Sequence, residues 1–187
     1  MNEEATKIDR FLCFIEQRII ERIEGTDIGE SCTATLLLIF AAIDSLSKIT
    51  CSDREFEEYK KPNGKRGNRH RFTGFLGNMM PQEYENHKQE IWNLRNDIVH
   101  TGIGTKVILS KNDLDTRHLE EANGHLWINT RQFFNDFIEA FHRIKKDIRN
   151  KGSFYQNARN RLNDFNIISI DDEDPATPSP GPDDSVF

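Results

Sequence analysis

The chain has 187 residues, which is enough for one ordinary domain with an appendage and too short for two full-sized domains. Hydrophobic residues make up 36% of the sequence and include 13 Phe, so folding requires neither disulfides nor a structural metal. The formal net charge of -6 excludes a uniformly basic coat for nucleic acid.

The negative charge is concentrated at the end of the sequence. Residues 171–187 contain six acids and no Lys or Arg, whereas residues 1–170 contain 25 acids and 25 bases. Four prolines also fall within 171–187. This composition predicts one folded domain at 1–170, followed by a disordered acidic tail.

Cysteine usage and hydropathy predict a cytoplasmic protein that does not contact a membrane. Cys13, Cys32 and Cys51 lie far apart without a Cys-x-x-Cys pair, which indicates reduced thiols. The N-terminal residues lack the pattern of a signal peptide. The longest apolar stretch, Leu36 to Ile43, is shorter than a bilayer span.

Apolar spacing predicts helices in the first third of the chain. Apolar residues from Ile8 to Ile23 recur every three or four positions, which predicts an amphipathic helix ending near Gly25. From about Glu30 to Lys48 the sequence is apolar nearly all round the helical wheel, as in the central helix of a bundle. Residues 60–71 combine two Gly and one Pro with six Lys or Arg, which predicts a flexible basic loop.

The middle of the chain predicts two more helices. A short one is expected at Phe72 to Met80. Pro81 suits the first turn of a long helix that runs to about His100, with Gly102 and Gly104 as stops.

The remaining segments complete a predicted all-α fold. Lys106 to Ser110 and His125 to Asn129 are expected to pair as an antiparallel hairpin. Thr130 is expected to cap a helix with apolar residues at a 3.6-residue period up to Ile148, and a further helical segment is expected at 154–165. We therefore predict a helical bundle of four or five helices with a small β-hairpin decoration.

The helix around residues 90–102 carries the residues of chemical interest. On a helical wheel its apolar face contains Arg95, while Asn93, Asn96, Asp97 and His100 form a polar stripe on the other side. A guanidinium is costly to desolvate, so Arg95 must meet an anion, a carbonyl cage or water. One solution is a structural ion pair with Asp44, the only acid between Leu36 and Ile49, and another is to extend out of the bundle.

The combination of residues in this helix is more informative than either charged residue alone. His100 by itself could serve only as a C-terminal cap. However, Arg95-Asn96-Asp97-Ile98-Val99-His100 closely resembles the Arg-x-x-x-x-His signature of the HEPN superfamily, in the form Arg-Asn-x-x-x-His. The resemblance implies a helical bundle that dimerises through its motif helices and, in many members, acts as a metal-independent endoribonuclease.

The resemblance assigns functional roles to Arg95, Asn96 and His100. His100 could transfer a proton at the ribose 2′-oxygen or the leaving oxygen, Arg95 could stabilise phosphoryl charge, and Asn96 could orient the imidazole or hold a phosphate oxygen. Arg95 and His100 are about 140° apart around one helix, which a two-fold dimer could reconcile.

The basic loop is the second candidate site. Its Lys and Arg side chains could hold an RNA backbone, or they could form a solvated mobile loop. These residues are Lys60, Lys61, Lys65, Arg66, Arg69 and Arg71. The loop lacks the pattern of a P-loop, and His118, His125 and His142 share no ligand spacing, so we expect no cofactor and no metal.

Three functions remain open on this basis. The first is a HEPN-type ribonuclease of the toxin or defence type, which cleaves RNA by 2′-hydroxyl attack and works as a homodimer with an antitoxin or regulatory partner. The second is a non-catalytic HEPN-like module for RNA or nucleotide binding or for dimerisation. The third is a helical scaffold whose acidic tail docks a basic partner.

Overall fold

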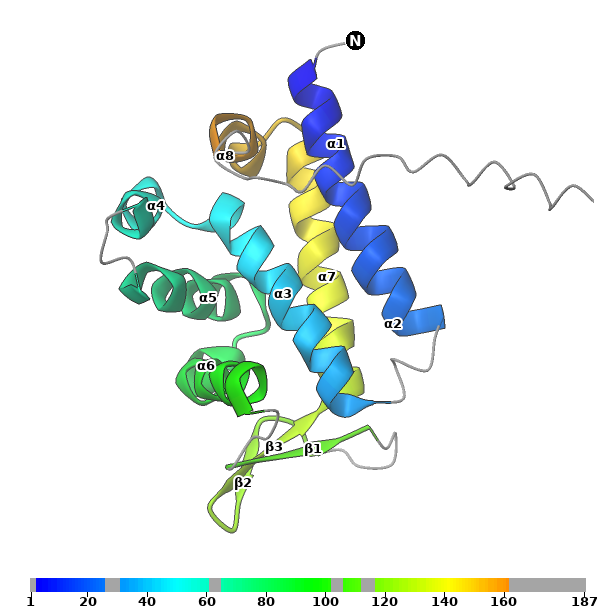
Figure 1. Ribbon diagram of the computed structural model, residues 1–187, viewed down its shortest axis with the longest axis vertical. Coiled ribbons are helices and arrows are strands. Elements are labelled where there is room, and N and C mark those ends of the chain that lie inside the picture. The colour runs from blue at the N-terminus through cyan, green and yellow to red at the C-terminus, as the bar shows by residue number, and fades with distance from the viewer. Residues whose placement is uncertain (1–2, 26–30, 61–64, 102–105, 112–116, 162–187) are drawn as a thin grey trace, which may run out of the picture.

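The computed structural model describes residues 3–25, 31–60, 65–101, 106–111 and 117–161 (Figure 1). The tail predicted at 171–187 lies outside these ranges. Within them the chain forms a helical bundle with a small sheet at one end, so the predicted all-α class with a β decoration is confirmed.

Helix α3, Cys32–Thr50, crosses the middle of the bundle between α5 and α6 on one side and α7 on the other (Figure 1). Ser31 caps its first turn by accepting a hydrogen bond from the Ala34 amide (3.3 Å). The predicted central helix is therefore confirmed. Its length and mean hydropathy of 1.6 would also suit a membrane span, but core helices of soluble proteins meet the same criterion. Half of the most apolar 18-residue stretch of this helix is buried in the bundle.

The first helical segment and the long C-terminal helix α7 cover one side of α3. Helix α1, Glu3–Ile15, continues through the π-helical turn η1, Glu16–Ile20, into α2, Glu21–Gly25. It ends at Gly25, as predicted. Helix α7, Thr130–Arg149, contributes Phe133, Phe137 and Phe141, which are completely buried.

Helices α4 (Asp53–Lys60), α5 (Lys65–Met79) and α6 (Tyr84–Thr101) lie on the other side of α3 (Figure 1). The prediction of a basic loop over residues 60–71 is wrong for Lys60, which ends α4, and for 65–71, which form the first half of α5. The rest of that prediction, 61–64, lies outside the described residues. Helix α5 buries Phe72, Phe75 and Leu76, and the Phe72 ring packs edge-on against Phe40 (5.6 Å between centroids). Such burial outweighs the low helix propensity of Gly67 and Asn68.

The start of α6 also differs from the prediction. Pro81 lies in the preceding turn, where its carbonyl accepts a hydrogen bond from the Tyr84 amide (3.0 Å), and the helix begins at Tyr84. The polar segment 81–83 therefore reverses the chain between α5 and α6 without extending either helix.

The sheet has the strand order β1-β3-β2, so the two predicted strands do pair, but their predicted antiparallel hairpin arrangement is wrong. Strand β1 (Val107–Ser110) pairs with β3 (His125–Asn129) in parallel, and β2 (Glu120–Ala122) is the antiparallel partner of β3. Asn123 and Gly124 join β2 to β3 with φ angles of 54° and 74°. Two successive positive φ angles are typical of a type I′ hairpin turn, for which Asn-Gly is the preferred sequence.

Asn129, not Thr130, caps α7. Its side chain accepts hydrogen bonds from the amides of Arg131 (3.0 Å) and Gln132 (3.1 Å). The Thr130 hydroxyl donates instead to the Ser110 carbonyl (3.0 Å), which fixes the end of β1 to the start of α7. Helix α8, Ser153–Arg161, covers the first part of the helical segment predicted at 154–165.

Candidate functional site

Arg95 lies on α6, two turns before the end of that helix, and forms an ion pair with Asp44 of α3. Its Nη2 donates to Asp44 Oδ2 (2.7 Å), and its Nη1 donates to Asn96 Oδ1 (3.1 Å). The ion pair foreseen from the sequence is therefore present. It is not sealed in the core, because the side chains of Arg95 and Asp44 are 23% and 32% exposed.

Aromatic side chains support the ion pair from within the bundle. The Arg95 guanidinium carbon lies 5.3 Å from the centroid of the Trp92 ring, which favours the cation. Trp92 in turn packs against Phe72 of α5 (5.4 Å). Arg95 Nε is buried and has no hydrogen-bond acceptor among the described residues, so the guanidinium is not fully used by its present partners.

The other motif residues follow Arg95 along α6. Asn96 is half-buried beside the ion pair, and His100 is exposed in the last turn of the helix. The spacing of five residues places Arg95 and His100 about 140° apart around the helix axis. On a single helix, the Arg95 cation and the His100 imidazole therefore point in different directions.

The basic residues of 60–71 have different environments. Arg69 is exposed and donates to Gln89 of α6, and Gln89 donates to Asn93 (2.9 Å), which extends the polar stripe of α6 away from His100. Arg71 is only 3% exposed, and it donates to Asn68, so its predicted role as an RNA contact is wrong. Lys61 lies outside the described residues, as do the side chains of Lys60, Lys65 and Arg66.

The α3 face that carries Asp44 also carries exposed apolar residues and a lysine. Leu37, Ala41, Asp44 and Lys48 recur at intervals of four, three and four residues, so they share one face of the helix. Leu37 and Ala41 are exposed, and Lys48 is half-buried. On α6, Val99 lies one turn after Arg95 and is 49% exposed. Exposed apolar side chains therefore lie next to the ion pair on both helices.

Lys48 lies one turn after Asp44 and is influenced by charges from two helices. Burial lowers the pKa of Lys48, and the charge of Arg71 lowers it further, while Asp44 has the opposite effect. Asp44 is thus in electrostatic contact with Lys48 as well as in direct contact with Arg95.

A second polar cluster, absent from the sequence predictions, joins α6, α7 and the segment before β2. The Tyr84 hydroxyl donates to Asp136 Oδ2 (2.7 Å) and lies 2.9 Å from His118 Nε2. Gln132 donates to the other carboxylate oxygen of Asp136 (2.8 Å). The contributing residues are separated by up to 52 positions, and no spacing pattern marks them, so the sequence held no signal for this cluster.

Burial controls the ionisation of this cluster. It lowers the pKa of His118 to about 4, although a hydrogen bond to the Asn129 backbone and the charge of Glu83 oppose it. Burial also raises the pKa of Tyr84 above its ordinary value and raises that of Asp136, whose hydrogen bonds from Tyr84 and Gln132 act in the opposite direction. At neutral pH, His118 is therefore an uncharged partner.

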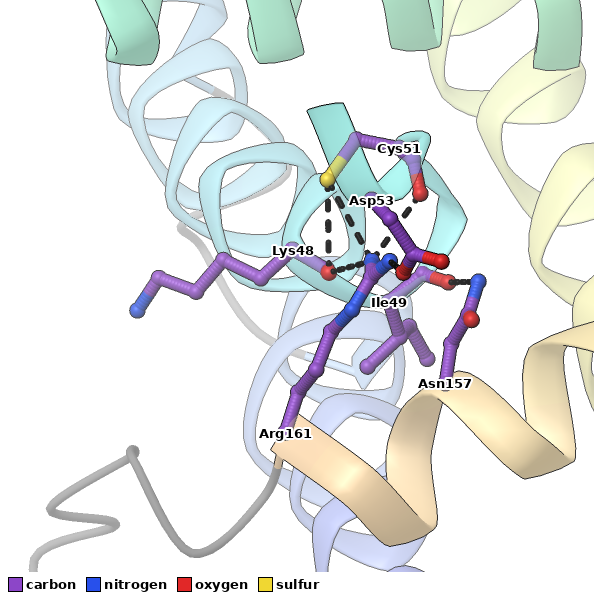
Figure 2. Close-up of polar contacts among 6 residues, drawn as sticks. All are labelled: Lys48, Ile49, Cys51, Asp53, Asn157 and Arg161. Atoms are coloured by element: carbon purple, nitrogen blue, oxygen red, sulfur yellow. Dashed lines mark hydrogen bonds and ion pairs between the residues drawn. The ribbon is translucent and has the colours of Figure 1, made fainter. Parts of the chain in front are cut away.

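Helix α8 supplies a third polar cluster, at the C-terminal end of α3 (Figure 2). Arg161 Nη1 donates to the carbonyls of Lys48 (2.8 Å) and Cys51 (2.9 Å), and Asn157 donates to the Ile49 carbonyl (2.9 Å). These carbonyls belong to the last turn of α3 and its cap, where acceptors lack partners within the helix. Arg161 Nη2 also forms an ion pair with Asp53. The cluster is structural, since its donors bind backbone carbonyls and a carboxylate at the junction of α3 and α4.

Of these clusters, the one around Arg95 has the features of a reactive site. It combines a partly exposed cation, a neighbouring amide and an exposed imidazole on one helix, whereas the other two are closed networks. Among the described residues, no group of three or more His, Cys, Asp or Glu could hold a metal ion. Comparison of the chain with models of protein families, with curated proteins and with solved structures gives no match.

Proposed function

We propose that the protein is a metal-independent endoribonuclease of the HEPN toxin or defence type, with Arg95, Asn96 and His100 as its catalytic residues. The observation that carries this proposal is the partly exposed Arg95–Asp44 pair, with Asn96 beside it and His100 exposed in the last turn of the same helix. The partial exposure of the pair leaves the Arg95 guanidinium accessible to a phosphate group.

The roles follow from the chemistry of each group. His100 exchanges a proton with the attacking 2′-oxygen or the leaving 5′-oxygen, because an imidazole can act as a general base or a general acid. Arg95 binds the non-bridging phosphate oxygens and stabilises the charge that develops on them. Asn96 holds the Arg95 guanidinium through its side-chain oxygen.

A homodimer completes the site. Because Arg95 and His100 point in different directions on one helix, two motif helices related by a two-fold axis can provide each phosphate with both groups. Exposed Leu37, Ala41 and Val99 provide apolar surface next to the ion pair for such an interface. A cytoplasmic location and an antitoxin or regulatory partner belong to the same proposal.

A non-catalytic binding module is the second candidate, and one observation favours it. Asp44 occupies Nη2 of Arg95 and compensates its charge, so the resting guanidinium is a weaker ligand for phosphate than an unpaired one. Such a module would bind RNA, or mediate dimerisation, without cleavage.

Cleavage of labelled total RNA in the presence of EDTA tests the proposal. Wild-type protein should cleave, and His100→Ala should abolish cleavage while its RNA affinity stays within a few-fold. His142→Ala is the matched control, because His142 is also exposed but lies on α7. If the folded dimer binds a broad RNA panel without cutting any of it, the binding module replaces the enzyme.

A further inference from the structure

In the resting site, Asp44 binds the same Arg95 guanidinium that is proposed to bind the RNA phosphate. To present Nη2 to a phosphate group, the Arg95 guanidinium must turn away from Asp44, which leaves a carboxylate that is only 32% exposed without its cation. Removing the partner of a partly desolvated charge is costly. The carboxylate therefore needs a second cation within reach.

Lys48 is placed to be that second cation. It follows Asp44 by four residues on α3, the spacing at which opposite charges on one helix face interact. The backbone of Lys48 is held in place because its carbonyl accepts from Arg161. Its side chain extends away from the Arg161 guanidinium, so the ammonium is not part of that cluster (Figure 2).

The surroundings of Lys48 also favour this role. Arg71 is buried on α5, and its charge disfavours the protonated form of Lys48, while the charge of Asp44 favours it. The charged ammonium therefore gains more from an Asp44 carboxylate that has lost Arg95 than from one that is already paired.

We propose that Lys48 is a positioning residue that takes over the Asp44 carboxylate when Arg95 turns to a phosphate group. Arg95 and Lys48 share one carboxylate, and the exchange between them allows the site to hold a guanidinium at rest and release it to the RNA backbone. This inference rests on the proposed function for its ligand, but the coupling of the three charges can be measured without RNA.

A stability cycle tests the coupling. Arg95→Ala should lower the melting temperature by about 2–4 °C more in a Lys48→Met background than in wild type, because Asp44 then loses both cations. Lys48→Arg keeps the charge and should remove this extra loss. Lys145→Met, at another half-buried lysine paired with Glu16 (2.6 Å), is the control that should be additive with Arg95→Ala. Additive losses for Lys48→Met would overturn the proposal.

A binding cycle tests the exchange. The probe is a single-stranded oligonucleotide of 2′-deoxynucleotides, which lacks the attacking hydroxyl. Lys48→Met should weaken binding several-fold, and this loss should disappear in an Asp44→Asn background, where Arg95 has no carboxylate to leave. A loss that persists with Asp44→Asn would show that Lys48 contacts the phosphate directly and would overturn the positioning role.

The two cycles separate the two proposals. If wild-type protein neither binds the oligonucleotide nor cleaves RNA, the proposed function fails, and the stability cycle still decides whether Lys48 and Arg95 share Asp44. If wild-type protein cleaves RNA but both cycles are additive, the ribonuclease stands and the role of Lys48 is rejected.

Discussion

The hydroxyl of Tyr84 and the carboxylate of Asp136, 52 positions apart in the chain, are joined by a buried hydrogen bond of 2.7 Å. Tyr84 is the first residue of α6 and Asp136 lies on α7, so this bond fixes the start of the motif helix against α7. The position of Arg95 and His100 therefore depends on a contact in another part of the fold.

Replacement of Tyr84 with Phe should destabilise the protein by about 1–3 kcal/mol, because Asp136 loses a buried donor while the ring packing on Phe133 remains. Urea denaturation monitored by circular dichroism measures the change. Tyr155→Phe, at a half-buried tyrosine of α8, is the matched control. An unchanged midpoint for Tyr84→Phe would show that water replaces the hydroxyl.

Stability should fall as the pH is lowered from about 6.5 to about 4, with His118 as one cause. The pKa of His118 is lowered to about 4 in the folded protein, so in this window the unfolded chain binds more protons and is favoured by acid. The raised pKa of Asp136 acts in the opposite direction, since acid then favours the folded form. Denaturation midpoints across this window should fall less steeply for His118→Gln. A slope equal to that of wild type would contradict the prediction.

Arg161→Ala should cost about 2–3 kcal/mol, because it removes charged hydrogen bonds to one buried and one half-buried carbonyl and the packing of the guanidinium on Phe56 (4.5 Å to the ring centroid). Thermal denaturation measures the loss. Arg159→Ala, an exposed arginine of the same helix, should change stability by less than about 0.5 kcal/mol. Equal effects of the two substitutions would show that α8 is not held by this cluster.

Arg69→Ala should weaken RNA binding and reduce the slope of log affinity against log salt by about one, as expected for one phosphate contact. Arg71→Ala is the informative comparison, because its buried guanidinium cannot reach a ligand and its loss should appear as reduced stability. Filter binding at several salt concentrations, with melting temperatures of both variants, separates the two effects. A reduced salt slope for a stably folded Arg71→Ala would contradict this assignment.

The Arg95–Asp44 pair could be predicted because the cost of desolvating a charge leaves few possible partners for a charged side chain on an apolar helix face. Arg95 falls on an apolar helix face, and Asp44 is the only acid in the central apolar helix. Each therefore requires a partner of opposite charge, which the other provides. The helical bundle was equally accessible, since hydrophobic periodicity reports directly which face of each helix is buried.

The burial of Arg71 could not be predicted from charge patterning. Six basic residues within 60–71 are typical of a solvated loop. The burial of Phe72 and Phe75 in the core accounts for a helix that begins as early as residue 65. The sheet is a different case. The Asn123-Gly124 dipeptide indicates the β2–β3 turn, whereas the parallel pairing of β1 with β3 depends on long-range packing.

Helix α3 receives the caps of its C-terminal end from residues 108 to 113 positions later in the chain. During synthesis, the carbonyls of Lys48, Ile49 and Cys51 leave the ribosome long before Asn157 and Arg161 and remain bonded to water until α8 arrives. The end of the central helix therefore depends on residues that are made much later than the helix itself. Docking of α8 supplies these donors, so a chain cut before Asn157 should leave the last turn of α3 to hydrogen-bond with water.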